Sequence, residues 1–258
     1  NSIKFLMEFT RNNFSDVVLS LARKNDINIV TIDSNQQQNY KKQLSKREEL
    51  FKILRETKNW FTTQLNSNLG NKAYDYLIND RKLSKNIIEQ FELGFAPDSW
   101  TGLYEYLLKV KGFSYEAILN AGLIISKDNK NKVFDRFRNR LIVPIYDSQS
   151  RVVAFTGRTL DGSNPKYLNS PETDVFEKGK ILYGLDKASS NIRKKDLAIV
   201  VEGNFDVISL HSKWINNCVA AQGSSLSKYQ ISQLCRCTDN KNIVINFDSD
   251  NAGISATK

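Results

Sequence analysis

Apolar positions in the first half of the chain recur at helical spacing. Residues 3–26 predict one or two amphipathic helices, and residues 46–93 predict a further series of helices. Residues 103–110 and 115–121 predict two short ones. Between the first two groups, residues 34–43 are rich in Gln and Asn and lack apolar periodicity, which indicates a linker. No internal repeat is apparent in the sequence.

The pattern changes to strands after Asn131. Apolar runs at 141–145 and 152–155 flank a polar turn at 147–150, which predicts a β-hairpin. Further along, apolar runs alternate with helical patterns as strand 197–201, helix 207–213, strand 218–221, helix 227–235 and strand 243–247. Apolar strands separated by helices indicate a parallel sheet. The predicted fold class is therefore α/β, with an α+β N-terminal subdomain followed by a parallel α/β subdomain.

Composition narrows the class of protein. With 258 residues, 40% of them hydrophobic, the chain can form one large domain or two modest ones. No apolar run approaches the roughly 18–20 residues of a membrane helix, and no signal peptide is apparent. Three Cys are too few for a disulfide framework and indicate a reducing compartment. Because the first residue is not Met, we expect a fragment or a processed chain.

Positive charge is concentrated in one part of the chain. The formal net charge is +9, and residues 130–195 carry 14 Lys and Arg against 7 Asp and Glu, a local net of +7. Such a surplus suits a polyanionic partner, most commonly nucleic acid. The alternative is a solvated basic face without a ligand.

Acidic residues follow two of the predicted strands. Glu202-Gly203 comes directly after the strand at 197–201, and Asp248 and Asp250 come directly after the strand at 243–247. Since the carboxyl ends of parallel strands share one edge of a sheet, these acids can converge there. Carboxylate oxygens select Mg²⁺ or Mn²⁺, and a metal beside a basic face suits phosphate chemistry. Asp206 either joins this cluster or caps the helix that follows it.

A series of motifs resembles one family of nucleic-acid enzymes. Residues 137–145, FRNRLIVPI, are similar to the signature FRxRxxxPI of bacterial-type replicative DNA primases. Similar motifs follow at Gly157-Arg158, 165–173 (PKYLNSPET), 176–179 (FEKG) and 182–184 (LYG). Residues 200–258 resemble the Toprim fold that these primases share with topoisomerases, through Glu202-Gly203-x-x-Asp206 and Asp248-x-Asp250.

The resemblance implies a domain organisation. Residues 1–32 correspond to the tail of a zinc-binding domain whose Cys and His ligands are absent here, and residues 33–46 to a linker. Residues 47–190 correspond to the basic, template-binding subdomain of the catalytic core, and residues 196–258 to a Toprim domain that is incomplete at its C-terminus. We therefore expect a chain that is truncated at both ends, with Zn²⁺ bound only by the missing N-terminal domain.

The resemblance also implies an activity, the synthesis of short RNA primers from NTPs on a single-stranded DNA template during replication. Two or more Mg²⁺ or Mn²⁺ ions would be held by Glu202, Asp248 and Asp250, with Asp206 as a further catalytic candidate. The family's basic surface corresponds to the DNA- and nucleotide-binding candidates Arg81, Arg136, Arg138, Arg140, Arg158, Lys166, Tyr167, Asn169 and Lys178. Arg136, Arg138 and Arg140 alternate, which on an extended segment would put them on one face.

The family implies further partners and a location. A replicative helicase would bind through a C-terminal domain absent here, and we expect a monomer, with no membrane association, in the cytoplasm at the nucleoid and replisome, or in an organelle. Two alternatives stay open. One is another Toprim enzyme, a topoisomerase or nuclease, and the other is a non-catalytic fragment that binds single-stranded DNA.

Overall fold

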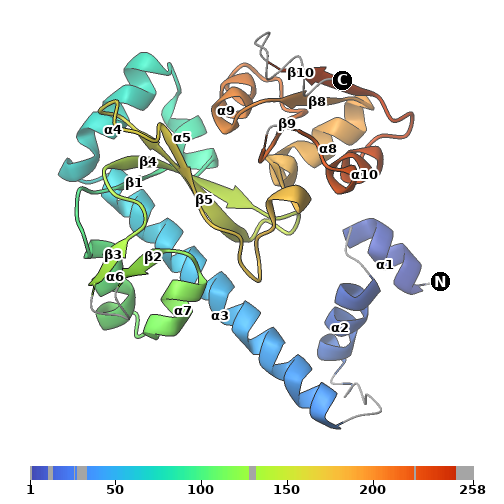
Figure 1. Ribbon diagram of the computed structural model, residues 1–258. Coiled ribbons are helices and arrows are strands. Elements are labelled where there is room, and N and C mark those ends of the chain that lie inside the picture. The colour runs from blue at the N-terminus through green and yellow to red at the C-terminus, as the bar shows by residue number, and fades with distance from the viewer. Residues whose placement is uncertain are drawn as a thin grey trace. The chain divides into compact units, whose positions relative to one another are not determined.

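The computed structural model describes residues 2–10, 14–25, 27, 34–127, 132–223 and 225–247 (Figure 1). The chain divides into two compact units, residues 1–47 and 48–258. The candidate acids Asp248 and Asp250 lie outside the described residues. Within the described ranges, no helix has the length and apolar character needed to cross a membrane.

The first unit is helical. Helices α1 (Ser2–Thr10) and α2 (Phe14–Lys24) confirm the helices predicted over 3–26. Residues 34–43, whose lack of apolar periodicity indicates a linker, are helical, because α3 spans Ser34–Leu65. Gln and Lys have high helix propensity, so a helix can form here without an apolar stripe.

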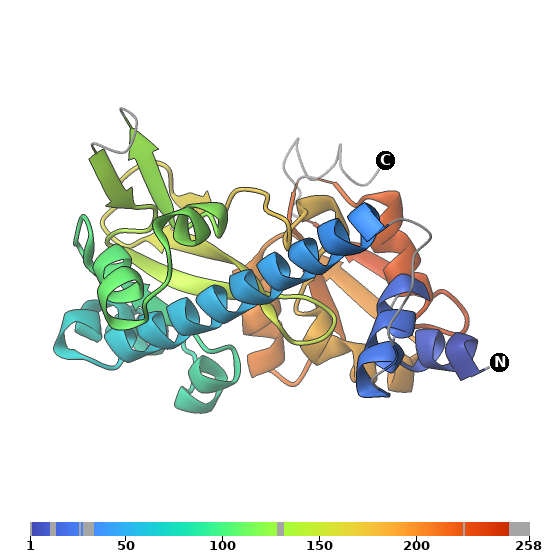
Figure 2. The same cartoon turned by 90° about the horizontal axis from the view of Figure 1, so that it is seen from below.

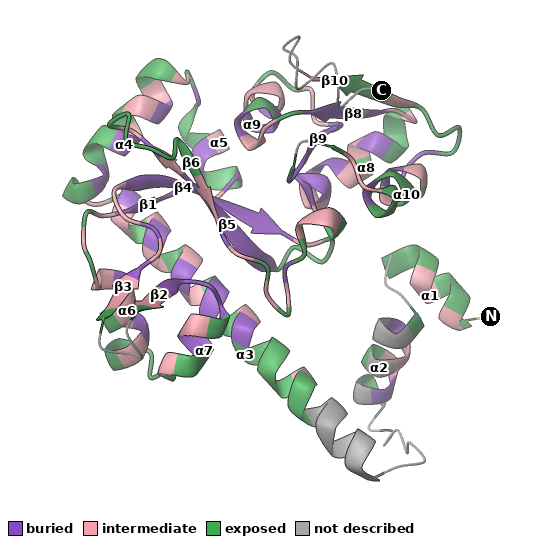
Figure 3. Cartoon of the chain, in the orientation of Figure 1, coloured by how far each residue is buried: buried purple, intermediate pink, exposed green. Residues whose placement is uncertain are grey.

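The second unit contains an antiparallel sheet against which α3 packs. Its strands are, in spatial order, β1 (Gly94–Ala96), β4 (Arg140–Tyr146), β5 (Val152–Thr159) and β6 (Tyr167–Asn169). Strands β4 and β5 form the predicted hairpin. Figure 2 shows the part of α3 that belongs to this unit running along the sheet, where Ile53 and Phe61 join Ile142 and Phe155 in one apolar cluster. The neighbouring β4 residue Leu141 belongs to a different cluster, so the strand is buried on both faces (Figure 3).

The helices beside this sheet form an internal repeat, contrary to the sequence interpretation. The first copy contains α4 (Asn71–Asp75), the π-helical turn η2 (Tyr76–Asp80), α5 (Lys85–Gln90) and β1. The second contains α6 (Gly102–Glu105), the π-helical turn η3 (Tyr106–Val110), α7 (Tyr115–Asn120) and β2 (Ile124–Lys127). The two π-helical turns start 30 residues apart in the chain, and this offset aligns the two copies. Aligned in this way, the copies are identical at Tyr74/Tyr104, Tyr76/Tyr106, Leu77/Leu107, Ser84/Ser114, Ile88/Ile118 and Leu93/Leu123.

Backbone geometry confirms the correspondence between the two copies. The side chains of Ser84 and Ser114 cap α5 and α7 by accepting the N–H of Ile87 and of Ala117, respectively. Two positions with positive φ also correspond between the copies. They are occupied by Lys82 and Glu92 in the first copy and by Gly112 and Gly122 in the second. The repeat is hard to detect from the sequence, because even these corresponding backbone positions are occupied by different residues.

The second sheet has the order β10-β8-β9-β7. Strands β8 (Ala198–Val201), β9 (Cys218–Ala221) and β10 (Ile243–Asn246) are parallel, as predicted, whereas β7 (Leu182–Tyr183) pairs with β9 in the antiparallel direction. The predicted helices here are α9 (Asn204–Ser212) and α10 (Lys228–Cys235). The 3-10 turn η4 (Lys178–Lys180) and helix α8 (Leu185–Lys195) were not predicted. Apart from these two four-stranded sheets, β2 pairs with β3 (Lys132–Asp135) in a small antiparallel sheet of two strands, and η1 (Asn68–Gly70) is a short 3-10 turn.

The two faces of this sheet are covered by different helices. Val200 and Val219 pack with α8 and α10, whereas Val201 and Ala220 pack with α9, as the alternation of side chains along a strand requires. The apolar cluster on the α9 side also contains Leu141 of β4. One continuous core therefore joins the two sheets of the second unit.

A buried carboxylate holds the start of the second repeat. The Asp135 side chain accepts the N–H of Leu103 at 2.8 Å and of Tyr104 at 2.9 Å, at the beginning of α6. Burial raises the pKa of Asp135 from its ordinary 3.8 to about 6. Folding therefore favours the protonated carboxyl, and this contribution to stability is present below about pH 3.8 and is lost as the pH rises through about 6.

We expect the stability gap between the wild type and Asp135→Asn to depend on pH. Asn does not titrate, so on going from pH 7 to pH 4 the free energy of unfolding of the wild type should rise relative to the variant, by up to about 3 kcal/mol. Urea unfolding of both proteins across this range measures the gap. A constant gap would show that folding does not raise the pKa of this carboxyl.

Candidate active-site cleft

A cleft of about 540 Å³ opens where the two sheets of the second unit meet. Its lining comes from the residue after η2, from β5, from β6 and the residue before it, from the segment 202–206 after β8, and from the end of β9 with the segment after it. The structure brings seven of the candidate residues together in this lining: Arg81, Arg158, Lys166, Tyr167, Asn169, Glu202 and Asp206. These positions are up to 125 residues apart in the chain, the span from Arg81 to Asp206.

The acidic side of the cleft is the carboxyl end of β8. Glu202 follows Val201, the last residue of that strand, and is exposed. Strand β10 runs parallel to β8 with Asn246 opposite Val201, so the two strands end at the same edge of the sheet. The strand order reverses at β8, and this kind of switch point is where open α/β sheets bind ligands.

Asp206 has a local structural role. Its Oδ2 accepts the N–H of Gly203 at 2.9 Å, which holds the turn between β8 and α9. A Cβ on Gly203 would lie 3.1 Å from the same oxygen, a tight approach that glycine avoids. Asp206 therefore fixes the turn that carries Glu202 from inside the first turn of α9, whereas the sequence alternative placed it as a cap ahead of the helix.

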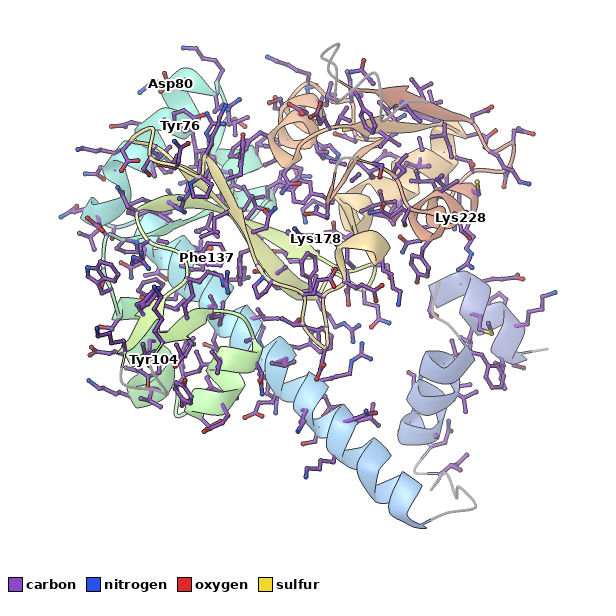
Figure 4. The ribbon with its side chains drawn as sticks, in the orientation of Figure 1. Tyr76, Asp80, Tyr104, Phe137, Lys178 and Lys228 are labelled. Carbon is purple, nitrogen blue, oxygen red and sulfur yellow. The ribbon has the colours of Figure 1, made fainter. Side chains whose placement is uncertain are left out.

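The basic side of the cleft is built on two aromatic rings. The guanidinium carbon of Arg81 lies 5.5 Å from the ring centre of Tyr76 and 4.9 Å from that of Phe205. The guanidinium carbon of Arg158 lies 5.3 Å and 5.7 Å from the same two rings. Figure 4 labels Tyr76 beside this part of the molecule. Cation–π contacts hold both arginines in place while leaving their charge uncompensated.

Two further residues extend this basic surface. Arg158 donates from Nη1 to the Tyr167 hydroxyl at 2.6 Å, and the Lys166 ammonium lies 5.9 Å from the Tyr167 ring centre. None of the ion pairs among the described residues involves Arg81, Arg158 or Lys166. The Nε of Arg158 is buried and has no acceptor within that part of the chain. A buried donor without a partner and three uncompensated cations together favour an anionic ligand.

Arg136, Arg138 and Arg140 do not share a face, which corrects the sequence interpretation. Asn139 has a φ of +48°, so this segment turns instead of running straight. Arg136 donates to the carbonyl of Gly122, and Arg138 stacks at 4.2 Å from the ring centre of Trp100. Arg140 is buried and donates at 2.9 Å to the carbonyl of Pro165. The structure places none of the three in the cleft lining, and their role in binding DNA stays a prediction.

Lys178 lies in the turn η4, outside the cleft lining (Figure 4). The side chain of Gln230, on α10, holds this turn. Its Nε2 donates to the carbonyls of Lys178 at 3.2 Å and of Ile181 at 2.7 Å, while its Oε1 accepts the N–H of Ser227. Gln230 is only 2% exposed. One buried amide thus satisfies three backbone groups and sets where Lys178 lies.

Gln230→Leu is expected to lower the free energy of unfolding by about 3 kcal/mol, because buried polar groups left without partners cost about 1–3 kcal/mol each. Gln233→Leu is the matched control on the same helix. The Oε1 of Gln233 is buried and has no hydrogen-bond partner among the described residues, so an apolar replacement there should be neutral or stabilising. Urea unfolding of the two variants measures both values. Equal losses in both would show that the Gln230 contacts contribute nothing specific.

Some of the side chains that could bind a metal ion lie among the described residues. Glu202 and Asp206 supply carboxylates at the cleft, and no group of three His, Cys, Asp or Glu gathers within the described residues. One Asp206 oxygen already accepts the Gly203 N–H. Hard carboxylate oxygens at a sheet edge fit Mg²⁺ or Mn²⁺ and not Zn²⁺, which prefers Cys and His. Glu202 is therefore the described residue best suited to hold such an ion.

Comparisons with known proteins agree with this geometry. The family described as DNA primase catalytic core, N-terminal domain, matches residues 60–189, and a Toprim-like family matches residues 199–258. The chain belongs to the DnaG-type primase family. The two matched segments of this primase core correspond to the two sheets, except that β7, inside the first match, pairs in the second sheet. Toprim domains and primases of this kind generally use divalent metal ions.

Relatives and solved structures place the chain within the family. It is 46% identical to the DNA primase of Synechococcus elongatus over all 258 residues, and it spans 37% of that protein. The DnaG primase catalytic domain solved bound to ssDNA matches with a TM-score of 0.75 at 35% identity, covering 83% of this chain and 65% of that one. The RNA polymerase domain of Mycobacterium tuberculosis primase DnaG matches with a TM-score of 0.73 at 32% identity, covering 81% and 69%.

Sequence reasoning missed several residues that support the candidate cleft. Tyr76 and Phe205 carry the two arginines, and Thr156, Asn204 and Gln222 lie in the lining. Phe205 and Asn204 are the two variable positions of Glu202-Gly203-x-x-Asp206, so their place in that motif was a usable signal. Tyr76 gave no such signal in the sequence, because an aromatic residue at a helical position usually packs in a core.

Proposed function

We propose that this chain is the catalytic part of a DNA primase that synthesises short RNA primers from NTPs on single-stranded DNA. The observation that carries the proposal is a single cleft that holds the strand-end carboxylate Glu202 together with the uncompensated cations Arg81, Arg158 and Lys166. Nucleotidyl transfer needs both, since the acids bind metal and the cations bind phosphates.

The basic side of the cleft would bind phosphate groups of template or nucleotide. Arg158 is already held by Tyr167 and by two rings, so little side-chain entropy is lost when it binds an oxyanion. The guanidinium of Arg158 can offer two donors to one phosphate, whereas Lys166 supplies a mobile point charge. Tyr167, 42% exposed, presents a ring on which a base or sugar can rest.

The acidic side would hold Mg²⁺ or Mn²⁺, two or more ions, through Glu202 together with Asp248 and Asp250. When bound, these ions would activate the attacking 3′-hydroxyl and neutralise charge on the triphosphate. Asp206 would act indirectly, through its hydrogen bond to Gly203, which orients the turn that carries Glu202. Gly203 leaves the approach to the carboxylate open because it has no side chain.

The remaining assignments rest on the family. A replicative helicase would bind a domain outside this chain, and the enzyme would work at the nucleoid, where its template is. The four regions 1–32, 33–46, 47–190 and 196–258 would be the zinc-domain tail, the linker, the template-binding subdomain and the Toprim domain. A topoisomerase or nuclease is not supported, because the family match over 60–189 is to primases.

Primer synthesis by the full-length protein tests the proposal. A single-stranded DNA template with the four NTPs and Mg²⁺ should give short RNA products, and omission of the metal should abolish them. The same reaction with a fully duplex template is the control. Template binding without RNA synthesis under Mg²⁺ and under Mn²⁺ would refute the catalytic assignment in favour of a binding fragment.

A further inference from the structure

Four polar side chains form one continuous line of hydrogen bonds in the cleft lining. Gln222 Nε2 donates to Asn204 Oδ1 at 3.4 Å, and Asn204 Nδ2 donates to Thr156 Oγ1 at 3.1 Å. The Thr156 hydroxyl in turn donates to Asn169 Oδ1 at 2.8 Å. Each group donates forward to the next, so the line has one direction and no donor faces a donor.

This line joins the two sheets. Thr156 and Asn169 lie on β5 and β6 of the first sheet, whereas Asn204 begins α9 and Gln222 follows β9 of the second. Thr156 is 5% exposed and Gln222 is 9% exposed. Since buried polar groups are costly to leave without partners, the contact between Asn204 and Thr156 is strongly favoured over separation of the sheets.

Three of the four residues in the line lie two positions from a group assigned to the chemistry. Thr156 precedes Arg158 by two positions on β5, and Asn169 follows Tyr167 by two on β6, so each pair shares one face of its strand. Asn204 follows Glu202 by two positions, in the turn that Asp206 fixes. A displacement of the line would therefore move the acidic and basic sides of the cleft relative to each other.

We propose that the hydrogen bond from Asn204 to Thr156 is a positioning contact that sets the distance between the Glu202 carboxylate and the phosphate-binding residues Arg158 and Tyr167. The proposal rests on the proposed primase function. Asn204 and Thr156 act through the groups beside them and not by touching the substrate. A misplacement of about 1 Å in such a site can cost about 10²-fold in rate.

Thr156→Val against Thr156→Ser tests the contact in the full-length protein. Val has nearly the same shape but no hydroxyl, so it breaks the line on both sides, whereas Ser retains it. We expect Thr156→Val to lower kcat about tenfold or more. The KM for NTPs and the Kd for single-stranded DNA should change less than about threefold in this variant. Thr156→Ser should be close to the wild type. Asn204→Ala should show the same split, and because Asn204 is only half-buried that variant should fold.

The double variant Asn204→Ala/Thr156→Val should be no worse than the poorer single one, because both changes break the same contact. Additive losses would overturn the proposal. So would a raised KM with unchanged kcat, which indicates direct substrate contact, or equal damage from Ser and Val.

Hydrogen exchange separates this proposal from the primase function itself. Without any substrate, Thr156→Val should speed amide exchange in β6 and in the first turn of α9, with β4 unchanged as the internal control. If the wild type makes no primer but this exchange pattern appears, the primase assignment fails and the positioning contact stands. If the wild type makes primer but exchange and kcat are unaltered in Thr156→Val, the contact has no positioning role.

Discussion

Glu202→Gln is expected to abolish primer synthesis, with a loss of at least about 10³-fold, while binding of single-stranded DNA persists. Gln keeps the size of the side chain but removes the anionic oxygen that a divalent ion needs at the end of β8. Folding should be unaffected, because Glu202 is exposed in the cleft and its loss relieves repulsion between acids. DNA binding should become slightly tighter, since one negative charge has left a phosphate-binding cleft.

Primer synthesis at saturating Mg²⁺ and NTPs measures the loss, and fluorescence anisotropy with a labelled single strand measures binding. Glu89→Gln is the matched control, because Glu89 is an exposed acid on α5 that pairs only with Lys85 at 3.7 Å among the described residues. A folded Glu202→Gln protein with near-normal synthesis would remove Glu202 from the metal site.

Arg158→Ala and Lys166→Ala are expected to weaken single-stranded DNA binding and to reduce its salt dependence. Removing one cation that binds a phosphate of a single strand lowers the slope of log K against log salt by about 0.7. Arg158→Ala should have the larger effect, because it also removes the partner of the Tyr167 hydroxyl. Titrations at several salt concentrations give both the affinity and the slope.

Arg158→Lys separates the contribution of the positive charge to DNA binding from the contribution of the planar guanidinium shape. The variant should keep the salt slope but not the affinity, since an ammonium cannot offer a planar pair of donors or stack equally well on Tyr76 and Phe205. Arg193→Ala, on α8 and outside the cleft lining, is the control for loss of one positive charge. An unaltered slope in both Arg158→Ala and Lys166→Ala would show that neither residue touches the DNA backbone.

The sequence predicted what depends on local pattern. Strands end where apolar runs end, so the position of Glu202 at the carboxyl end of β8 followed from Val200 and Val201 and the alternation of helices and strands. The same reasoning placed the hairpin of β4 and β5. The candidate Asp248 follows from the same argument at β10, and its role stays a prediction.

The sequence could not predict what depends on a single dihedral angle or on distant contacts. The alternation of Arg136, Arg138 and Arg140 indicated that their side chains lie on one face of an extended segment. The positive φ of Asn139 instead turns the chain between Arg138 and Arg140. Asn can adopt that conformation at little cost, and nothing in its neighbours requires it. Likewise, the rings beneath Arg158 come from η2 and α9, which meet only after the two sheets have packed together.

The internal repeat gives the two copies equivalent side chains that are used differently. Each copy places a cation over the corresponding tyrosine, Arg81 over Tyr76 at 5.5 Å and Lys111 over Tyr106 at 5.6 Å. In the second copy the cation is neutralised by Glu56, at 2.8 Å, and serves the scaffold. In the first copy it has no such carboxylate among the described residues and opens onto the cleft. Equivalent positions of the two copies thus serve different ends, since one cation stabilises the scaffold and the other is available to a ligand.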